Sequence, residues 1–309
     1  MGKKGKLFGL GILLLVFLFG VVWYGFSDLM ADWMVQSERA KAGLAQKAVT
    51  VADHRIVYLD GGKGETVVLV HGFGGDKDNW TRFAGQLTGN YHVIAVDLPG
   101  FGESTRDPKA SYTYELQVER LHALFEKLNL NQVNLVGNSM GGQIVGLYAV
   151  TYPEQVKSVS FFDAAGVVSP KPSELTKALN QSRNPLLVNK EEDFDRLIAF
   201  NFSNPPYIPG PLKQSFAKAA VAHRAFNQKI FNEIIGGTGK LQPRLGEIKA
   251  PSLILWGAED RVLDPSSVPV FEAGLKDHTT VILPNCGHLP MLELPTESEK
   301  AYRDFLTKD

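Results

Sequence analysis

The chain has 309 residues, of which 44% are hydrophobic and 21% charged, and this ordinary globular composition excludes a disordered or collagen-like protein. The 32 basic residues nearly balance the 33 acidic ones, so the charge gives no indication of a nucleic-acid surface. A single cysteine, Cys286, excludes an internal disulfide framework and a cysteine-rich zinc site.

The N-terminal stretch from Leu7 to Ser27 carries no charged residue. A helix of this length, rising about 1.5 Å per residue, spans about 30 Å, the thickness of a bilayer core. Lysines precede the stretch and aromatic residues stand near its end, so residues 1–27 are predicted to form a transmembrane anchor whose N-terminus is cytoplasmic. The alternative is a cleaved signal peptide, but the nearest Ala-x-Ala sequence, at residues 40–42, lies well beyond the apolar run.

Residues 28–50 are predicted to form an amphipathic juxtamembrane helix. Leu29 and Trp33 are four residues apart, as are Met30 and Met34, so each pair shares a helix face. Such a helix either lies on lipid or pairs with a second copy of the chain, which would give a homodimer through the N-terminal helices. The remaining alternative is a solvated spacer.

From residue 51 to residue 309, short apolar runs alternate with longer helical patterns. Several runs are continuously apolar, as expected for strands that are covered on both faces. The pattern predicts one α/β domain with a mostly parallel sheet and helices on both faces. The predicted strands are Arg55–Leu59, Val67–Val70, His92–Val96, Val133–Val136, Val159–Phe162, Leu253–Leu255 and Val281–Leu283.

The alternation stops between about residues 168 and 246. This segment contains many prolines and phenylalanines, two helical patterns and no convincing strand. It is too long for an ordinary loop, so a helical cap over a binding site is predicted. A packing subdomain without a gating role is the alternative.

Ser139 lies in the sequence Gly137-Asn-Ser-Met-Gly141, between a predicted strand and a predicted helix. This Gly-x-Ser-x-Gly context is typical of a nucleophile elbow, in which the serine occupies a strained strand-to-helix turn. A serine hydroxyl is a weak nucleophile at neutral pH, so it needs a neighbouring base. The motif requires an acid and then a histidine later in the chain.

His288 is the predicted base because it follows a strand, in a loop. His278 stands in a polar stretch just before that strand and is interpreted as a solvated turn residue. His223 falls on a helical stretch of the cap and is interpreted as a surface residue.

Asp260 is the predicted acid because it follows the strand Leu253–Leu255, at the edge where sites gather in open α/β sheets. Asp163, after the preceding strand, is the alternative triad acid. Asp264 is interpreted as a helix N-cap before Pro265. Asp260 would hold His288 in the required tautomer and stabilise its protonated form.

The oxyanion hole is predicted to use the backbone N–H groups of Phe73 and Met140. Phe73 lies in the loop His71-Gly-Phe-Gly-Gly75, after an early strand, and Met140 directly follows the nucleophile. His71 is interpreted as a brace of that loop. A metal held by His71 and His288 has no supporting carboxylate pattern, so no metal and no cofactor are expected.

Taken together, these motifs resemble those of the α/β-hydrolase superfamily over roughly residues 51–309. The matching segments, in chain order, are His71–Gly75, Asp97–Ser104, Gly137–Gly142, Trp256–Asp260 and Gly287–His288. The resemblance implies an α/β-hydrolase fold with a serine nucleophile and a helical cap.

Within the superfamily, the chain is most similar to Moraxella-type bacterial lipases and membrane-anchored bacterial phospholipase A, through residues 71–79 and cap segments such as Pro205–Pro209. The implied function is a membrane-anchored hydrolase of lipid carboxylic esters, held in a bacterial inner membrane with its catalytic domain in the periplasm. The meta-cleavage C–C hydrolases share Gly-Asn-Ser-Met-Gly-Gly, but they carry Trp where Leu289 stands here. A non-catalytic, membrane-tethered binding protein on the same fold is the third hypothesis.

Overall fold

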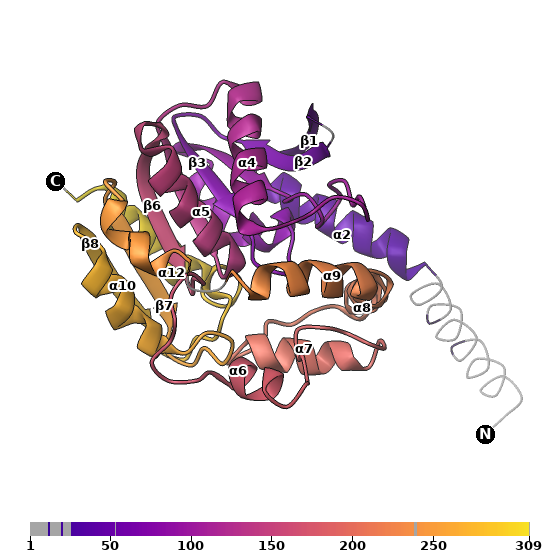
Figure 1. Ribbon diagram of the computed structural model, residues 1–309. Helices are drawn as coiled ribbons and strands as arrows, with labels where there is room; N and C mark the ends of the chain where they lie inside the picture. The colour runs from indigo at the N-terminus through magenta and orange to yellow at the C-terminus, as the bar shows by residue number, and fades with distance from the viewer. Residues whose placement is uncertain (1–11, 13–19, 21–25, 53, 238–239, 309) are drawn as a thin grey trace, which may run out of the picture.

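The structure is a computed structural model that describes residues 12, 20, 26–52, 54–237 and 240–308. Within these residues, eight strands form one sheet in the order β1-β2-β4-β3-β5-β6-β7-β8 (Figure 1). β1 pairs with β2 and β2 with β4 in antiparallel fashion, and the other pairs are parallel. The strands are β1 (Leu44–Val51), β2 (His54–Gly61), β3 (Glu65–Val70), β4 (Tyr91–Val96), β5 (Val133–Asn138), β6 (Val156–Phe162), β7 (Ser252–Gly257) and β8 (His278–Leu283).

Helices cover both faces of the sheet, as the sequence predicts. Phe125, Tyr148 and Phe271 pack into a core on one face. Phe83 and Tyr302 belong to a second core, which lies on the other face. All six residues of β7 are buried, which explains why the sequence has a continuous apolar run at Leu253–Leu255. The helices that supply these residues are α3 (Thr81–Leu87), α4 (Tyr114–Leu128), α5 (Met140–Thr151), α10 (Val268–Gly274) and α12 (Pro295–Leu306), and the short α11 (Pro290–Glu293) precedes α12.

The juxtamembrane helix predicted for residues 28–50 is wrong in its second half. Helix α2 spans Ser27–Lys41, and the chain turns at Gly43, whose φ of 68° is in the left-handed region. β1 follows at once and pairs with β2 along its whole length. The backbone hydrogen bonds of this ladder outweigh the helical preference of the alanines in residues 44–51. The sheet therefore begins at Leu44, before the predicted domain boundary at residue 51.

The anchor predicted for residues 1–27 falls almost wholly outside the described residues. Among the residues that are described, no helix has both the length and the apolar character needed to cross a membrane. Helix α2, which starts at Ser27, has two unlike faces. Ser27, Ala31 and Arg39 are buried on one face, whereas the large side chains of Leu29 and Trp33 are exposed on the other.

The segment between β6 and β7 is helical, and its described residues contain no strand. It comprises α6 (Glu174–Leu179), α7 (Asp193–Asn201), α8 (Gly210–Ala222), α9 (Arg224–Ile235) and a 3-10 turn, Gln242–Glu247. Phe194 of α7 and Ala217 of α8 form a small core of their own with Val188. In Figure 1 these helices gather at one end of the sheet, with α8 beside α2.

Candidate active site

Ser139 occupies a sharp turn between β5 and α5. Its backbone angles, φ 53° and ψ −120°, are unusual for a residue with a side chain. Such a conformation costs about 1–3 kcal/mol and persists only where the surrounding structure enforces it. Here the strand and helix approach so closely that a Cβ atom at Gly137 would lie 2.3 Å from the carbonyl oxygen of Gly141. The turn therefore presents a partly exposed serine at the end of a buried strand.

The imidazole of His288 lies beside the carboxylate of Asp260. Their Nδ1 and Oδ2 atoms are 2.8 Å apart, and both side chains are buried. The other oxygen of Asp260 accepts hydrogen bonds from the backbone N–H groups of Val262 and Leu263, at 2.7 and 3.0 Å. With its carboxylate fixed in this way, Asp260 holds the proton of His288 on Nδ1 and leaves Nε2 as the proton acceptor.

The other candidate acids have different partners. The buried Asp163 accepts a hydrogen bond from the N–H of Gly257 at 2.9 Å, and its second oxygen has no hydrogen-bond partner among the described residues. Burial, followed by the charge of Asp260, raises the pKa of Asp163 above its ordinary value. Asp264 accepts from the N–H of Ser266 at 2.9 Å, the capping contact predicted for it.

The other histidines that the sequence singled out are engaged elsewhere. His71 is buried and donates from Nδ1 to the carbonyl of Gly72 at 2.7 Å, while its Nε2 accepts from the N–H of Leu98 at 3.1 Å. Burial lowers the pKa of His71, which favours the neutral ring that these two contacts require. His71 thus braces its loop, as predicted. His278 contacts the carbonyl of Leu275, and His223 stands at the junction of α8 and α9.

Donor atoms of Asp163, Asp260 and His288 lie within 4.8 Å of one another, a spacing that could hold a metal ion. The oxygens of Asp260 already accept three hydrogen bonds, one of them from His288. These contacts orient the imidazole of His288 through its Nδ1 atom, which is the arrangement expected of a base that is held by a carboxylate.

The loop that carries Phe73 lies directly against the nucleophile. A Cβ atom at Gly72 would come within 3.0 Å of both the Cβ of Ser139 and the side-chain oxygen of Asn138. The ring of Phe73 packs edge-on against Phe101 and Phe231, at centroid distances of 5.9 and 5.4 Å. The described part of the chain offers no acceptor for the N–H of Phe73.

Met140 is the first residue of α5, where the N–H groups of a helix have no partner within the helix. Its N–H, like that of Phe73, donates to no acceptor in the part of the chain that is described. Within the described residues, the N–H groups of Phe73 and Met140 are therefore both without an acceptor, and that of Met140 lies at the positive end of a helix. An oxyanion hole requires backbone donors of this kind.

Asn138 is a site residue that the sequence reasoning missed. Its side-chain amide donates to the carbonyl of His288 and to that of Phe162, both at 3.0 Å. It thereby ties the strand that leads to Ser139 to the loop that carries the histidine. The available signal was a polar residue at the end of a predicted strand, directly before the predicted nucleophile.

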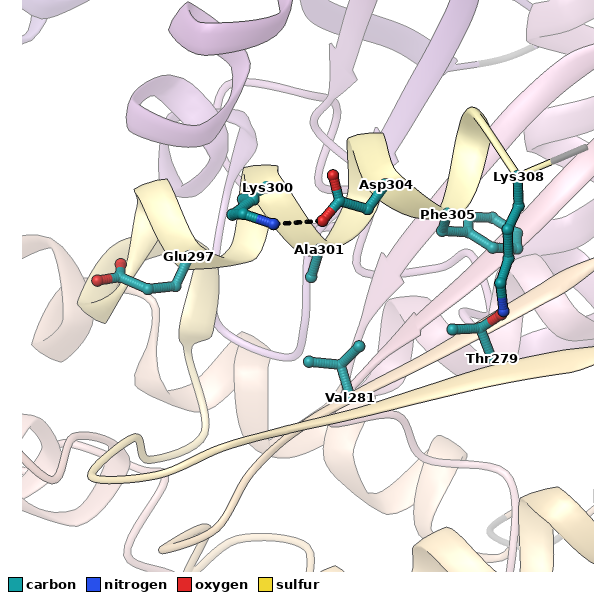
Figure 2. Close-up of a pocket in the computed structure, with 8 residues that line it drawn as sticks. All are labelled: Thr279, Val281, Glu297, Lys300, Ala301, Asp304, Phe305 and Lys308. Carbon is teal, nitrogen blue, oxygen red and sulfur yellow. Dashed lines mark hydrogen bonds and ion pairs between the residues drawn. The ribbon is translucent and has the colours of Figure 1, made fainter.

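A separate surface hollow of about 310 Å³ lies between β8 and α12. Figure 2 shows its walls, which combine the apolar side chains of Val281 and Phe305 with lysines and acids. None of its lining residues belongs to the Ser139 site or to the cap.

The sequence matches a known protein family. The sequence profile of the alpha/beta hydrolase family matches residues 67–301. The chain belongs to this family. Lipase 1 of Psychrobacter immobilis is 36% identical to it over 279 residues, which cover 88% of this chain and 87% of the lipase. This alpha/beta hydrolase is an ester hydrolase. Lipase 3 of Moraxella sp. (strain TA144) is likewise 36% identical to it over 285 residues, which cover 89% of this chain and 90% of that lipase. The predicted resemblance to Moraxella-type lipases is therefore confirmed.

A solved structure agrees with the sequence comparison. The crystal structure of a membrane phospholipase A, described as a bacterial virulence factor, superposes on this alpha/beta hydrolase with a TM-score of 0.90 and 44% sequence identity. The superposition covers 97% of this chain and 98% of the phospholipase.

Proposed function

We propose that this protein is a membrane-anchored serine hydrolase that cleaves carboxylic esters of lipids through an acyl-enzyme on Ser139. The observation that carries the proposal is the buried contact between His288 and Asp260, in a loop that Asn138 ties to the strained turn at Ser139. The lipid substrate is supported by the lipase and phospholipase names of its relatives.

In the first half of the reaction, Ser139 Oγ attacks the ester carbonyl carbon while His288 Nε2 takes the hydroxyl proton. The carbonyl oxygen becomes an oxyanion, which the N–H groups of Phe73 and Met140 stabilise. The intermediate then expels the alcohol, which receives the proton from His288, and the acyl group stays on Ser139. Each oxyanion donor is expected to contribute about 10²–10³ in rate.

In the second half, His288 takes a proton from a water molecule that attacks the acyl-enzyme. The second tetrahedral intermediate expels Ser139 Oγ, which recovers its proton from His288, and the carboxylic acid leaves. Asp260 stabilises the protonated imidazole in both halves and stays ionised itself. No cofactor takes part in these steps.

The membrane attachment rests on the N-terminal part of the chain. The uncharged residues 7–27 run directly into α2, where the side chains of Leu29 and Trp33 are 65% and 70% exposed. An apolar strip this exposed is unfavourable in water and favourable at a lipid interface. We therefore assign α2 to the surface of a bacterial inner membrane, with the catalytic domain in the periplasm. The same strip could pair two copies of the chain.

The test uses the full-length chain in detergent and compares three substrates. They are nitrophenyl butyrate, a phosphatidylcholine, and a dienone whose hydrolysis breaks a C–C bond. Hydrolysis of both esters, lost in Ser139→Ala, is the expected result. A fluorophosphonate probe should label the wild type and not the variant. Preference for the dienone would favour the C–C hydrolase, and an unlabelled, inactive wild type would favour the binding protein. Activity retained in Ser139→Ala would overturn the mechanism.

A further inference from the structure

The guanidinium group of Arg39, near the end of α2, is buried and fully engaged. Its Nε and Nη2 atoms each lie 2.6 Å from one of the two carboxylate oxygens of Asp78. Its Nη1 donates to the side-chain oxygen of Gln46 in β1, also at 2.6 Å. A two-pronged pair of this kind fixes distance and orientation together, which a lysine could not do.

Asp78 belongs to a 3-10 turn (Lys77–Trp80) that directly follows the oxyanion loop. The side chain of Asp76 caps this turn by accepting from the N–H of Asp78 at 2.9 Å, and the side chain of Asn79 accepts from the N–H of Asp76 at 3.2 Å. The turn is therefore held by its own hydrogen bonds, and it continues directly from the oxyanion loop. Only five positions separate Asp78 from Phe73, whose N–H is the proposed oxyanion donor.

Lys77 connects the same turn to a second loop. Its buried Nζ lies 2.9 Å from Asp97 and 2.9 Å from Glu103, and Glu103 also lies 3.4 Å from Nη2 of Arg39. The segment between Asp97 and Glu103 contains Phe101, whose ring packs against Phe73. Two chains of contacts thus connect Arg39 to Phe73. One runs through the capped turn, and the other runs through the loop that contains Phe101.

We propose that Arg39 is a positioning residue for the oxyanion hole, which acts through Asp78 and makes the rate of ester hydrolysis depend on the placement of α2. This inference rests on the proposed serine-hydrolase function. Helix α2 follows the predicted anchor, and its buried face packs beside α8 of the cap. A shift of α2 is therefore transmitted to the loop that carries Phe73.

The experiment measures nitrophenyl butyrate hydrolysis by full-length Arg39→Gln, Asp78→Asn and the double variant. The matched control is Lys41→Gln, because Lys41 lies on the same helix and its ion pair with Glu38 is exposed. We expect kcat to fall about tenfold or more in each single variant, with KM changed less than threefold. This loss is smaller than the loss of about 10²–10³ in rate that follows removal of a whole oxyanion donor. The double variant should be no slower than the slower single variant, because both remove one interaction.

A second readout separates positioning from a general loss of structure. A boronic acid that forms a tetrahedral adduct with the serine should lose affinity in proportion to kcat, whereas labelling by a fluorophosphonate should still go to completion. A kcat within twofold of wild type in both single variants, an effect confined to KM, or an equal loss in Lys41→Gln would overturn the inference. If Arg39→Gln does not fold, the isosteric Asp78→Asn decides alone. An inactive wild type would count against the proposed function instead.

Discussion

Gly72 lies so close to Ser139 that a Cβ atom at position 72 would come within 3.0 Å of the Cβ of Ser139. The loop proposed to supply one oxyanion donor is therefore packed onto Ser139, the proposed nucleophile. Any side chain at position 72 must displace either the loop or the serine. The distance between the donor and the reacting oxygen depends on this contact.

Gly72→Ala should consequently lower kcat by about tenfold to a hundredfold, because a displacement of a few tenths of an ångström weakens the hydrogen bond from Phe73 in the transition state. The matched control is Gly89→Ala, where a Cβ atom would meet nothing within 4 Å. Steady-state kinetics on nitrophenyl butyrate check the result. Equal kcat values for the two variants would contradict the role given to the loop.

Asp260→Asn should lower kcat by about 10³–10⁴-fold, because an amide cannot stabilise protonated His288 and favours the wrong tautomer. The backbone contacts of Asp260 to Val262 and Leu263 use an oxygen that asparagine retains, so the melting temperature should change little. Asp264→Asn serves as the control, since its carboxylate only caps a turn. A loss below tenfold in Asp260→Asn would mean that another acid supports His288.

Asp163→Asn should retain activity within about threefold of wild type. Burial and the nearby charge of Asp260 raise the pKa of Asp163, which disfavours its charged form, so the neutral side chain of asparagine should replace it with little effect on catalysis. The kcat/KM profile between pH 5 and pH 9 checks the prediction. If Asp163 were the ionised triad acid, this variant would be the inactive one and Asp260→Asn would remain active.

Asp76 makes the stability of the protein depend on pH. Burial, with the charges of Asp78 and Asp97, raises the pKa of Asp76 to about 7 in the folded state. The unfolded chain loses this proton near pH 4, so between about pH 4 and pH 7 the folded state binds more protons. The contribution of Asp76 to the stability of the fold is therefore greatest below pH 4, and it is lost as the pH rises to 7.

Asp76→Asn keeps the capping oxygen but has no proton to lose. The free energy of unfolding of the variant, relative to wild type, should therefore increase between pH 5 and pH 7, by at most about 1.4 kcal/mol per pH unit. Urea denaturation at the two pH values provides the measurement. If the difference in unfolding free energy between the variant and the wild type is the same at both pH values, the pKa of Asp76 is not raised in the folded state.

Leu29→Gln combined with Trp33→Gln should reduce hydrolysis of phosphatidylcholine vesicles about tenfold and leave soluble nitrophenyl butyrate unaffected. Each of these side chains gains about 1.5–3 kcal/mol when it is fully buried in an apolar phase. Ile282→Gln is the control, because Ile282 is 44% exposed on β8, at the other edge of the sheet. Parallel losses on both substrates would argue against a membrane role for the strip.

Much of the molecule is predictable from local pattern. Continuous apolar runs indicate buried parallel strands, and the Gly-x-Ser-x-Gly sequence between a strand and a helix indicates the turn at Ser139. The failure at β1 is equally physical. Residues 44–51 form a strand only because β2 lies beside them, and the local pattern of alanines does not contain that information.

The sequence by itself determined the class of fold, the order of the serine, the acid and the histidine along the chain, and the uncharged N-terminal run. These features depend on residue type and on short spacing. Only the tertiary structure decided which carboxylate touches His288, how Asn138 joins two loops, and that Arg39 contacts Asp78 across 39 positions of sequence. Such contacts are made by strand order and loop packing, which bring together residues whose separation along the chain carries no periodic signal.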